Sequence, residues 1–259
     1  MGKPGGNGLA DGLLCGFGVF ETMRRHRKRI VYLSQHLVRL KDSCKLIGLP
    51  LKLSSAQLAG IIRKSTRINR LGEAYVRVTV WRQGSGSEVS VIVKKYTPPS
   101  REKYRRGFSV CISPYRQNEN SLFSGVKTIS RILYELAFQQ AQKKNFDEAL
   151  ILNSRGYLAE ASRGNIFLVK AGEVFTPGLE CGCLDGITRR VIFDLAKKER
   201  LKISEGSFTV ADLYSADEAF LTNSLIGVMP LVAVEKQRIA GGKPGRVTKF
   251  FMEKYDELL

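Results

Sequence analysis

The N-terminal part of the chain alternates apolar and polar residues in a pattern that predicts β-strands. Two β-prone segments, residues 17–22 and 30–33, flank the basic run MRRHRKR, which predicts a hairpin with a charged tip. Residues 74–81 read AYVRVTVW, with an apolar side chain at every second position, and the turn RQGSGS leads into residues 88–96. Residues 108–112 form the last candidate strand of this half.

Two helices are predicted between these strands. In SQHLVRLKDSCKLIGLP, apolar residues recur at positions 37, 40, 44 and 47, which is the spacing of one helix face. We place Ser34 as the N-cap and Gly48 as the stop signal, because each residue type is favoured at that end of a helix. A second helix is expected over residues 54–68.

The remainder of the chain predicts a second domain. Residues 113–125 are polar and break the periodicity, so we expect a linker there. Beyond it, ISRILYELAFQQAQKKN and GITRRVIFDLAKKER have the period of amphipathic helices. Short strands are expected at residues 147–153, 164–169, 173–177 and 218–224. The pattern therefore predicts an α+β fold with an N-terminal α/β domain (1–112), a C-terminal α+β domain (126–259) and an active cleft between them.

Charge changes this picture only slightly. Lys and Arg number 42 against 24 Asp and Glu, a formal net charge of +18, which attracts nucleic acids, phosphorylated cofactors and carboxylates alike. A solvated turn explains the densest basic run, and neither a recognition motif nor interleaved aromatic residues accompany it. We therefore expect no nucleic-acid partner. A nucleic-acid-binding protein on a degenerate enzyme scaffold is the alternative from another class, and steeply salt-sensitive binding would support it.

The apolar stretches and the cysteines exclude further classes of protein. No uninterrupted apolar stretch reaches about 18 residues, so no membrane span or membrane partner is expected. The N-terminal sequence MGKPGGNGLADGLL lacks the apolar core of a signal peptide, which favours a cytoplasmic location. Five cysteines form no C-x-x-C pair, and CGC at 181–183 offers too few ligands for zinc, which needs three or four. Reduced thiols and no metal are expected.

One lysine stands out by its position. Lys127 lies between an irregular, glycine-containing segment and a long helix, with Arg131 one turn further on. A lysine amine has a pKa of about 10.4 and becomes nucleophilic at neutral pH only where burial or a nearby positive charge lowers that pKa. Position alone does not make Lys127 catalytic.

Several segments in a fixed order strengthen the case for Lys127. They are GFGVFETMR, HLVRL, VKTISR, DEALILNSRGYLAEASRGNIF, FTPGLECGCLDGITR and FLTNSLIGVMP. Together, from about residue 12 to the C-terminus, they resemble the class IV (fold-type IV) pyridoxal-phosphate enzymes, which include branched-chain and D-amino-acid aminotransferases and 4-amino-4-deoxychorismate lyase. The resemblance implies a two-domain, D-amino-acid aminotransferase-like fold with pyridoxal 5'-phosphate in the cleft between domains.

The resemblance also assigns cofactor-binding residues. Lys127 occupies the position of the Schiff-base lysine, which also transfers the substrate proton, and Glu160 that of the acid paired with the pyridine nitrogen. Arg39 matches the arginine that binds the cofactor phosphate. Further phosphate donors are expected where a helix opens and in a late turn: the amides of Gly186 and Ile187, Thr188 with its hydroxyl, and the Ser224 hydroxyl.

The reaction is less strongly indicated than the cofactor. The loop LTNSLIGVMP, with Asn223, resembles lyase versions, and Ile132 after Arg131 replaces a tyrosine common in branched-chain aminotransferases. In contrast, AYVRVTV resembles an aminotransferase segment whose tyrosine and arginine, here Tyr75 and Arg77, contact a substrate carboxylate. RQGSGSE also lacks the second arginine of many lyases. We expect the lyase, releasing pyruvate and 4-aminobenzoate for folate synthesis, with an amino-acid aminotransferase as the alternative.

Two further expectations follow from the resemblance. It implies a homodimer that binds a small carboxylate or amine substrate. Members of the family usually begin with one or two more strands and an Asp-Arg pair before the glycine motif, whereas MGKPGGNGLADGLL is short and lacks that arginine. The edge of the N-terminal sheet is therefore expected to differ from that of the family.

Overall fold

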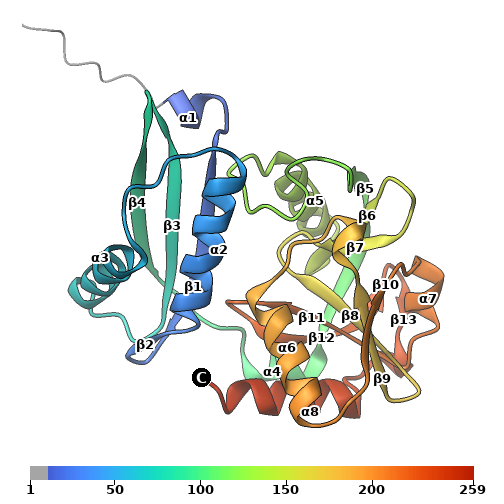
Figure 1. The fold of residues 1–259 in the computed structure, drawn as a ribbon. Coiled ribbons are helices and arrows are strands. Elements are labelled where there is room, and N and C mark those ends of the chain that lie inside the picture. The colour runs from blue at the N-terminus through green and yellow to red at the C-terminus, as the bar shows by residue number, and fades with distance from the viewer. Residues whose placement is uncertain (1–10) are drawn as a thin grey trace, which may run out of the picture. The chain divides into compact units, whose positions relative to one another are not determined.

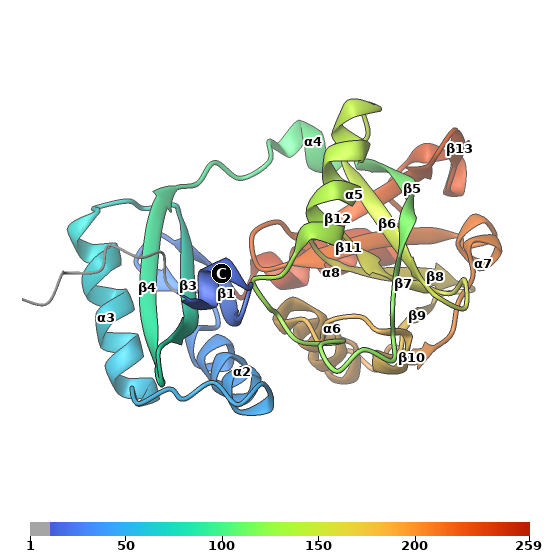
Figure 2. The same ribbon diagram turned by 90° about the horizontal axis from the view of Figure 1, so that it is seen from above.

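The computed structural model describes residues 11–259, which fold into two compact units (Figures 1 and 2). Unit 1 consists of Met1–Tyr96 with Val126–Ser130, and unit 2 of Thr97–Gly125 with Arg131–Leu259. The boundary therefore falls at Tyr96 and not after residue 112 as the sequence predicted. The reason is strand pairing, because residues 108–117 form a strand that hydrogen-bonds to strands of unit 2.

Unit 1 is an antiparallel sheet with two helices on one face. Its strands pair in the order β2-β1-β3-β4, and β1 and β3 run side by side from the Gly18–Trp81 pair to the Arg25–Ala74 pair. The elements are α1 (Asp11–Leu14), β1 (Gly18–His26), β2 (Arg29–Ile30), α2 (Leu33–Leu46), α3 (Ser55–Ile68), β3 (Ala74–Gln83) and β4 (Gly86–Lys95).

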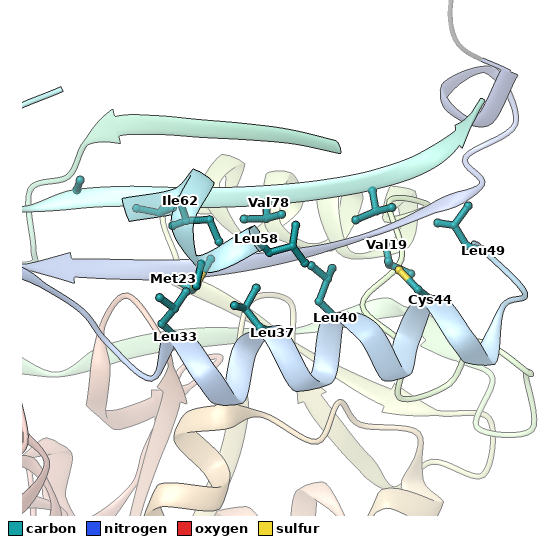
Figure 3. Packing of buried hydrophobic residues seen from close by; sticks show 14 residues of the cluster. Val19, Met23, Leu33, Leu37, Leu40, Cys44, Leu49, Leu58, Ile62 and Val78 are labelled. Carbon is teal, nitrogen blue, oxygen red and sulfur yellow. The ribbon is translucent and has the colours of Figure 1, made fainter. Parts of the chain in front are cut away.

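The core of unit 1 lies between the sheet and the helices α2 and α3 (Figure 3). Strand β3 contributes every second residue, as its alternation predicted, and the apolar faces of the two helices close over them. Burial of these side chains removes apolar surface from water and is the main force holding the helices to the sheet. The fully buried members include Val19, Met23, Leu40, Leu58, Ile62, Ala74, Val76, Val78 and Val80.

Helix boundaries in unit 1 follow the sequence prediction only in part. Helix α3 begins after Ser54, whose hydroxyl accepts from the Gln57 amide in a capping box, in agreement with the predicted start. The N-cap of α2 is Tyr32 with a left-handed φ of 52°, so the prediction that Ser34 caps this helix is wrong. The chain turns directly from the short strand β2 into α2, which leaves no room for the strand expected over residues 30–33.

Unit 2 is built on a long mixed sheet in the order β10-β9-β8-β11-β12-β5-β6-β7, with β13 paired to β12. Its strands are β5 (Phe108–Gln117), β6 (Glu148–Asn153), β7 (Leu158–Ala161), β8 (Asn165–Lys170), β9 (Glu173–Pro177), β10 (Ile203–Gly206), β11 (Glu218–Asn223), β12 (Gly227–Val234) and β13 (Gln237–Arg238). Its helices are α4 (Arg101–Arg106), α5 (Ile132–Lys143), α6 (Ile187–Lys198), α7 (Val210–Tyr214) and α8 (Arg246–Asp256), with 3₁₀ turns η1 (Leu179–Cys181) and η2 (Ala240–Gly242).

The structure corrects the sequence prediction in unit 2 at several points. Strand β5 continues to Gln117, so the first part of the expected linker is a strand that pairs Arg116 with Leu152 of β6. Helix α5 begins at Ile132, later than the predicted start of its periodic segment. The short strand β7, which carries Glu160, was not predicted because its four residues show no clear alternation.

Helices cover both parts of this sheet. Helix α5 packs on β5 and β6 through Ala137 and Ala141, whose small side chains allow close approach to Cys111 and Ile151. Phe251 of α8 packs against Phe220 of β11. Each helix in the described range 11–259 is too short or too polar to span a bilayer.

Candidate active site

Lys127 is fixed against strand β1 by backbone hydrogen bonds within unit 1. The Phe20 amide donates to the Lys127 carbonyl at 2.9 Å, and the Ile129 amide donates to the Gly18 carbonyl at 2.9 Å. A Cβ on Gly18 would lie 2.6 Å from the Val80 carbonyl oxygen, so only glycine fits between the segment and β3. Residues 126–130 therefore form a short extension of the sheet that carries Lys127.

The Lys127 side chain lies beside an aromatic ring that also contacts a candidate substrate-binding arginine. Its Nζ is 4.8 Å from the centre of the Phe20 ring, and the Arg77 guanidinium lies 3.7 Å from the same centre. Arg77 Nε also donates to Thr79 Oγ1 at 3.2 Å. Tyr75 and Arg77 alternate with buried valines of β3, so both project from the sheet face opposite the helices. The structure thus gathers Lys127 and Arg77 around Phe20.

Arg39 belongs to a buried cluster with Glu21 and His36. Its Nε and Nη2 donate to the two oxygens of Glu21 at 2.7 and 2.8 Å, and His36 Nδ1 donates to Glu21 Oε2 at 2.7 Å. Burial raises the pKa of Glu21, but the charge and hydrogen bond of Arg39, with the hydrogen bond of His36, outweigh it and bring the pKa to about 2. Glu21 is therefore a buried carboxylate at neutral pH.

The imidazole of His36 stays neutral in this cluster. Burial lowers its pKa, and the positive charges of Arg39 and Lys127 lower it further, while Glu21 acts in the opposite direction. The influence of Lys127 on His36 shows that the lysine amine acts electrostatically on this cluster. The role of Arg39 toward a phosphate remains a prediction; its observed partner is Glu21.

The sequence contained a signal for this cluster that we did not use. Glu21 stands between Val19 and Met23 on the core-facing side of β1, where a carboxylate requires charged partners. His36 and Arg39 are three positions apart on α2, so they lie on one helix face, as such a partner set requires.

In unit 2, Glu160 is held by two hydrogen bonds and is 6% exposed. The Tyr134 hydroxyl donates to Oε1 at 2.9 Å, and the Leu184 amide donates to Oε2 at 3.2 Å. Both donors were absent from the predicted site. The carboxylate is therefore fixed in orientation, as a group that pairs with a ring nitrogen needs to be.

Tyr134 is in turn held by Arg131, the residue predicted to bind substrate. The Arg131 guanidinium lies 4.1 Å from the centre of the Tyr134 ring, and its Nη2 donates to the Ser162 carbonyl at 2.8 Å. Burial, followed by the charge of Glu160, raises the pKa of Tyr134 above its ordinary value, so the hydroxyl keeps its proton and remains a donor. Arg131 therefore joins the start of α5 to the end of β7.

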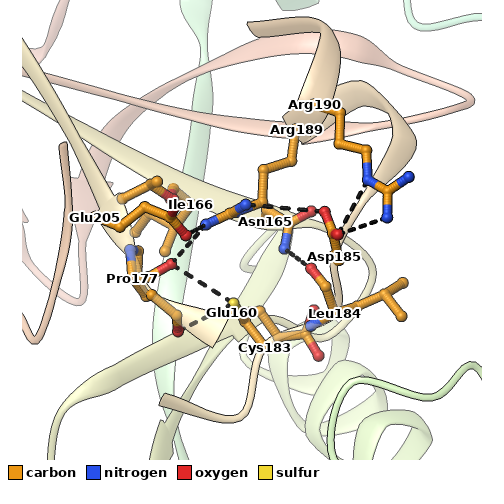
Figure 4. A network of polar contacts seen from close by, with 12 residues as sticks. Glu160, Asn165, Ile166, Pro177, Cys183, Leu184, Asp185, Arg189, Arg190 and Glu205 are labelled. Atoms are coloured by element: carbon orange, nitrogen blue, oxygen red, sulfur yellow. Dashed lines mark hydrogen bonds and ion pairs between the residues drawn. The ribbon is translucent and has the colours of Figure 1, made fainter. Parts of the chain in front are cut away.

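The loop that supplies the Leu184 amide is anchored from several sides (Figure 4). Asn165 Nδ2 donates to the Leu184 carbonyl at 2.7 Å, and the Cys183 thiol lies 3.6 Å from the Pro177 carbonyl oxygen. Arg189 Nη2 also donates to the Pro177 carbonyl at 3.2 Å. Burial, and then the charge of Glu160, raises the pKa of Cys183, so this thiol remains protonated.

The N-terminus of α6 has the features of a phosphate site. The first intrahelical bond is made by the Arg190 amide to the Gly186 carbonyl at 3.0 Å, so the amides of Ile187 and Thr188 precede it. Thr188 is 1% exposed, and its Oγ1 has no hydrogen-bond partner among the described residues. A buried hydroxyl without a partner, beside amides at the positive end of a helix, fits an anion such as the cofactor phosphate.

Asn223 and Ser224 lie in the turn between β11 and β12. Asn223 Nδ2 donates to the Arg163 carbonyl at 2.8 Å, and its Oδ1 accepts from the amides of Leu225 and Ile226, both at 2.9 Å. Asn223 therefore shapes this turn, and a role in substrate binding remains a prediction, as does phosphate binding by Ser224.

A second buried carboxyl, Glu148 on β6, was absent from the predicted site. Its Oε1 accepts from the Ala149 amide at 2.9 Å and from the Ser162 hydroxyl. Burial raises the pKa of Glu148 to about 7, and the hydrogen bonds of Ser162 and Ala149 only partly oppose it. Because Ser162 is two residues beyond Glu160, the protonation of Glu148 bears on the strand that carries Glu160.

Comparison with known proteins identifies the sequence family. Residues 18–234 match the family described as amino-transferase class IV. A branched-chain-amino-acid aminotransferase of Pseudomonas aeruginosa is 32% identical over 267 residues, which cover 97% of this chain and 87% of that protein.

Solved structures share the fold. A branched-chain amino acid aminotransferase of T.th. (the abbreviation of its source) with pyridoxamine 5'-phosphate matches with a TM-score of 0.89 and 26% identity, over 98% of this chain and 90% of that one. A Legionella pneumophila protein provisionally named 4-amino-4-deoxychorismate lyase matches with a TM-score of 0.91 and 20% identity, over 97% and 95% of the chains. At that identity the second likeness speaks for the fold alone.

Proposed function

This chain belongs to the class IV aminotransferase family, whose cofactor is pyridoxal 5'-phosphate, and we propose that it is an amino-acid aminotransferase of the branched-chain type. The observation that carries the proposal is the 32% identity to a branched-chain aminotransferase over nearly the whole chain. The lyase expected from the sequence becomes the second candidate, since its structural neighbour is only 20% identical.

The reaction assigns distinct tasks to Lys127 and Glu160. When bound, pyridoxal phosphate supplies an aldehyde that takes up the substrate amine and a ring that withdraws electrons from the α-carbon. The Lys127 amine holds the cofactor between turnovers, and once displaced it takes the α-proton and delivers it again. Glu160 keeps the ring nitrogen protonated, and its bonds from Tyr134 and the Leu184 amide aim the carboxylate.

Phosphate binding falls to the start of α6 and its neighbours. The orphaned Thr188 hydroxyl and the Ile187 and Thr188 amides supply donors, and Ser224 adds a second hydroxyl. Arg39 adds a positive charge, with Glu21 and His36 fixing its side chain. The Glu21 carboxylate limits how much of that charge reaches an anion, so α6 is proposed to contribute most of the affinity.

Substrate recognition is proposed to involve Arg77 and Tyr75. An amino acid and its keto acid partner both carry a carboxylate, which a guanidinium binds with two parallel hydrogen bonds. Arg77 lies on the same aromatic ring as Lys127, so it can orient a substrate whose α-carbon must meet the lysine amine.

Two specific features keep the lyase as the second candidate. Arg131 follows Lys127 by four residues, and the side chain at position 132 is isoleucine, which cannot donate the hydrogen bond of a tyrosine. The β11–β12 turn also has Asn223 where aminotransferases carry small residues. Arg131 is committed to Tyr134 and Ser162, which weakens its case as a substrate ligand.

One pair of assays separates the candidates. The purified protein, loaded with pyridoxal phosphate, is incubated with leucine and 2-oxoglutarate, and glutamate is measured. In parallel it is given 4-amino-4-deoxychorismate, and pyruvate is measured. Glutamate formation without pyruvate supports the proposal, whereas pyruvate release without glutamate overturns it in favour of the lyase. The Lys127→Ala variant is the blank for both assays.

The proposal extends to the setting of the enzyme. As in the sequence-based expectation, we propose a cytoplasmic homodimer. Light scattering after size-exclusion chromatography tests the assembly, and a mass equal to one chain of 28.9 kDa would contradict it.

A further inference from the structure

The excess positive charge of the chain is concentrated in unit 1. Residues 1–96 and 126–130 contain 19 Lys and Arg against 5 Asp and Glu, a net charge of +14. The rest of the chain contains 23 against 19, a net charge of +4. A catalytic site for small carboxylates needs only a few cations, so the reaction does not account for this asymmetry.

Seven exposed cations of unit 1 lie on two neighbouring elements, and we call them the basic face. They come from the β1–β2 hairpin tip and the outer side of α3: Arg27, Lys28, Arg29, Arg63, Lys64, Arg67 and Arg70. Arg25 of β1 joins the elements, because its Nη1 donates to the Thr66 carbonyl at 3.1 Å and to the Leu71 carbonyl at the end of α3. Figure 1 shows β2 close to the end of α3.

Carboxylates do not neutralise the basic face. None of its seven side chains forms an ion pair with a residue in the described range 11–259. Between residues 22 and 72, Asp42 is the one acidic residue of the sequence. The flanking carboxylates are engaged elsewhere: Glu21 pairs with Arg39 and His36, and Glu73 with Arg24 and His26. The face therefore presents its charge to solvent.

We propose that the basic face binds the phosphate backbone of double-stranded nucleic acid without regard to sequence. Five of the seven side chains are arginines, whose planar fork matches a phosphate bidentately. The seven include no aromatic residue on which an unpaired base could stack, so the face offers phosphate contacts and not base readout. This function is independent of the proposed transamination.

The arrangement of α3 favours a nucleic acid over an anionic bilayer. Lys64 and Arg67 lie opposite the buried side chains of Leu58 and Ile62, so cations occupy the outermost part of the helix. The exposed apolar side chains of α3, Ile61 and Ile68, lie at the border with the buried face. A bilayer-binding helix would instead place apolar side chains outermost, where they can enter the membrane.

The test is the salt dependence of binding to a fluorescently labelled random-sequence duplex of about 24 base pairs, followed by fluorescence anisotropy with the loaded enzyme. If all seven cations meet phosphates, the slope of log K against log salt concentration is about −6. The variant Lys28→Gln, Arg29→Gln, Lys64→Gln, Arg67→Gln should reduce the slope to about −3 and weaken binding at low salt by at least about tenfold.

A matched control removes the same charge from unit 2. The residues Lys143, Lys144, Lys197 and Lys198 are exposed, and their fourfold change to Gln should leave slope and affinity as in the parent protein. Both variants should keep full catalytic activity, because no changed residue belongs to the proposed catalytic machinery. Equal weakening by both variants, or no duplex binding at low salt, overturns the proposal. Binding to phosphatidylserine vesicles that Ile68→Ser abolishes, without duplex binding, overturns it in favour of a lipid surface.

Discussion

The Tyr134 hydroxyl donates a 2.9 Å hydrogen bond to Glu160, the carboxylate assigned to the ring nitrogen of the cofactor. The two residues are 26 positions apart, and they meet because α5 packs over the sheet that carries β7. Arg131 holds the tyrosine ring, and the Leu184 amide holds the other oxygen of Glu160. The orientation of Glu160 therefore depends on three elements that share no local sequence motif.

Removal of this hydroxyl tests its importance for the cofactor. Tyr134→Phe leaves the Glu160 carboxylate with one fewer donor, and a hydrogen bond to a charged group contributes about 1.5–3 kcal/mol. We expect transamination to fall about tenfold and the pH dependence of the cofactor's visible absorption to shift, because the basicity of Glu160 changes. Absorption spectra recorded from about pH 5 to 9 measure the shift. Tyr214→Phe, in the same unit but outside this network, should change neither; equal effects of both variants would contradict the assignment.

Thr188→Val tests the phosphate site at α6. Valine has the same shape but no hydroxyl, so the orphaned Oγ1 is removed without a cavity. We expect the affinity for pyridoxal phosphate to fall about tenfold, since a donor to a charged phosphate is lost. The cofactor-free protein should be at least as stable as the parent, because a buried, unpaired polar group has been removed.

Thr248→Val is the matched control for this experiment. Thr248 on α8 also has a buried Oγ1 without a partner among residues 11–259. This change should affect stability as Thr188→Val does while leaving cofactor affinity unchanged. Titration of the cofactor-free proteins with pyridoxal phosphate, and urea denaturation, measure the two quantities. If Thr188→Val binds the cofactor as tightly as the parent, its hydroxyl is not a phosphate ligand.

Glu21 is predicted to stabilise unit 1 by its negative charge. Its pKa in the folded state is about 2, below its ordinary value of 4.5, so its contribution is full above pH 4.5 and is lost as the pH falls toward 2. The shift corresponds to about 3 kcal/mol. Glu21→Gln should lower the free energy of unfolding at pH 7 by about that amount and flatten its decline between pH 4.5 and 2. The exposed Glu88→Gln serves as control, and an unchanged acid profile in Glu21→Gln would show the prediction to be wrong.

Glu148 is predicted to act on stability with the opposite sign. Its folded-state pKa of about 7 lies above the ordinary 4.5, so the folded protein binds a proton that the unfolded chain releases. Its contribution is present below pH 4.5 and is lost as the pH rises through 7, at a cost of about 3 kcal/mol. Glu148→Gln should therefore be more stable than the parent at pH 8, relative to their difference at pH 4.5. Urea denaturation at both values measures this, and a pH-independent difference between the proteins would refute it.

The sequence predicted those features that depend on local pattern. Alternation in β3 and the Ser54 cap of α3 are set by neighbouring residues, and both appear as expected. Ser34 failed as a cap because Tyr32, in a left-handed conformation, already ends the preceding turn. Residues 113–117 are polar yet form a strand, because β5 obtains its hydrogen bonds from β6 in another part of the sequence.

The candidate site divides in the same way. Lys127 and Thr188 could be named from sequence because each lies at the start of a recognisable segment. Tyr134 could not, because only the packing of α5 brings its hydroxyl to Glu160. Glu148 sits in a continuous apolar strand, where its charge signals burial but not its partner, Ser162. Long-range contacts between such residues require the three-dimensional fold.

The central claim is that the Lys127 amine carries the cofactor, and reduction with borohydride tests it most directly. The loaded protein is treated with borohydride, digested and mapped by mass spectrometry, with Lys127→Ala as the control. We predict a single phosphopyridoxyl label, on the peptide containing Lys127, and no label in the variant. A label on another lysine, or an equal label in Lys127→Ala, would contradict the account.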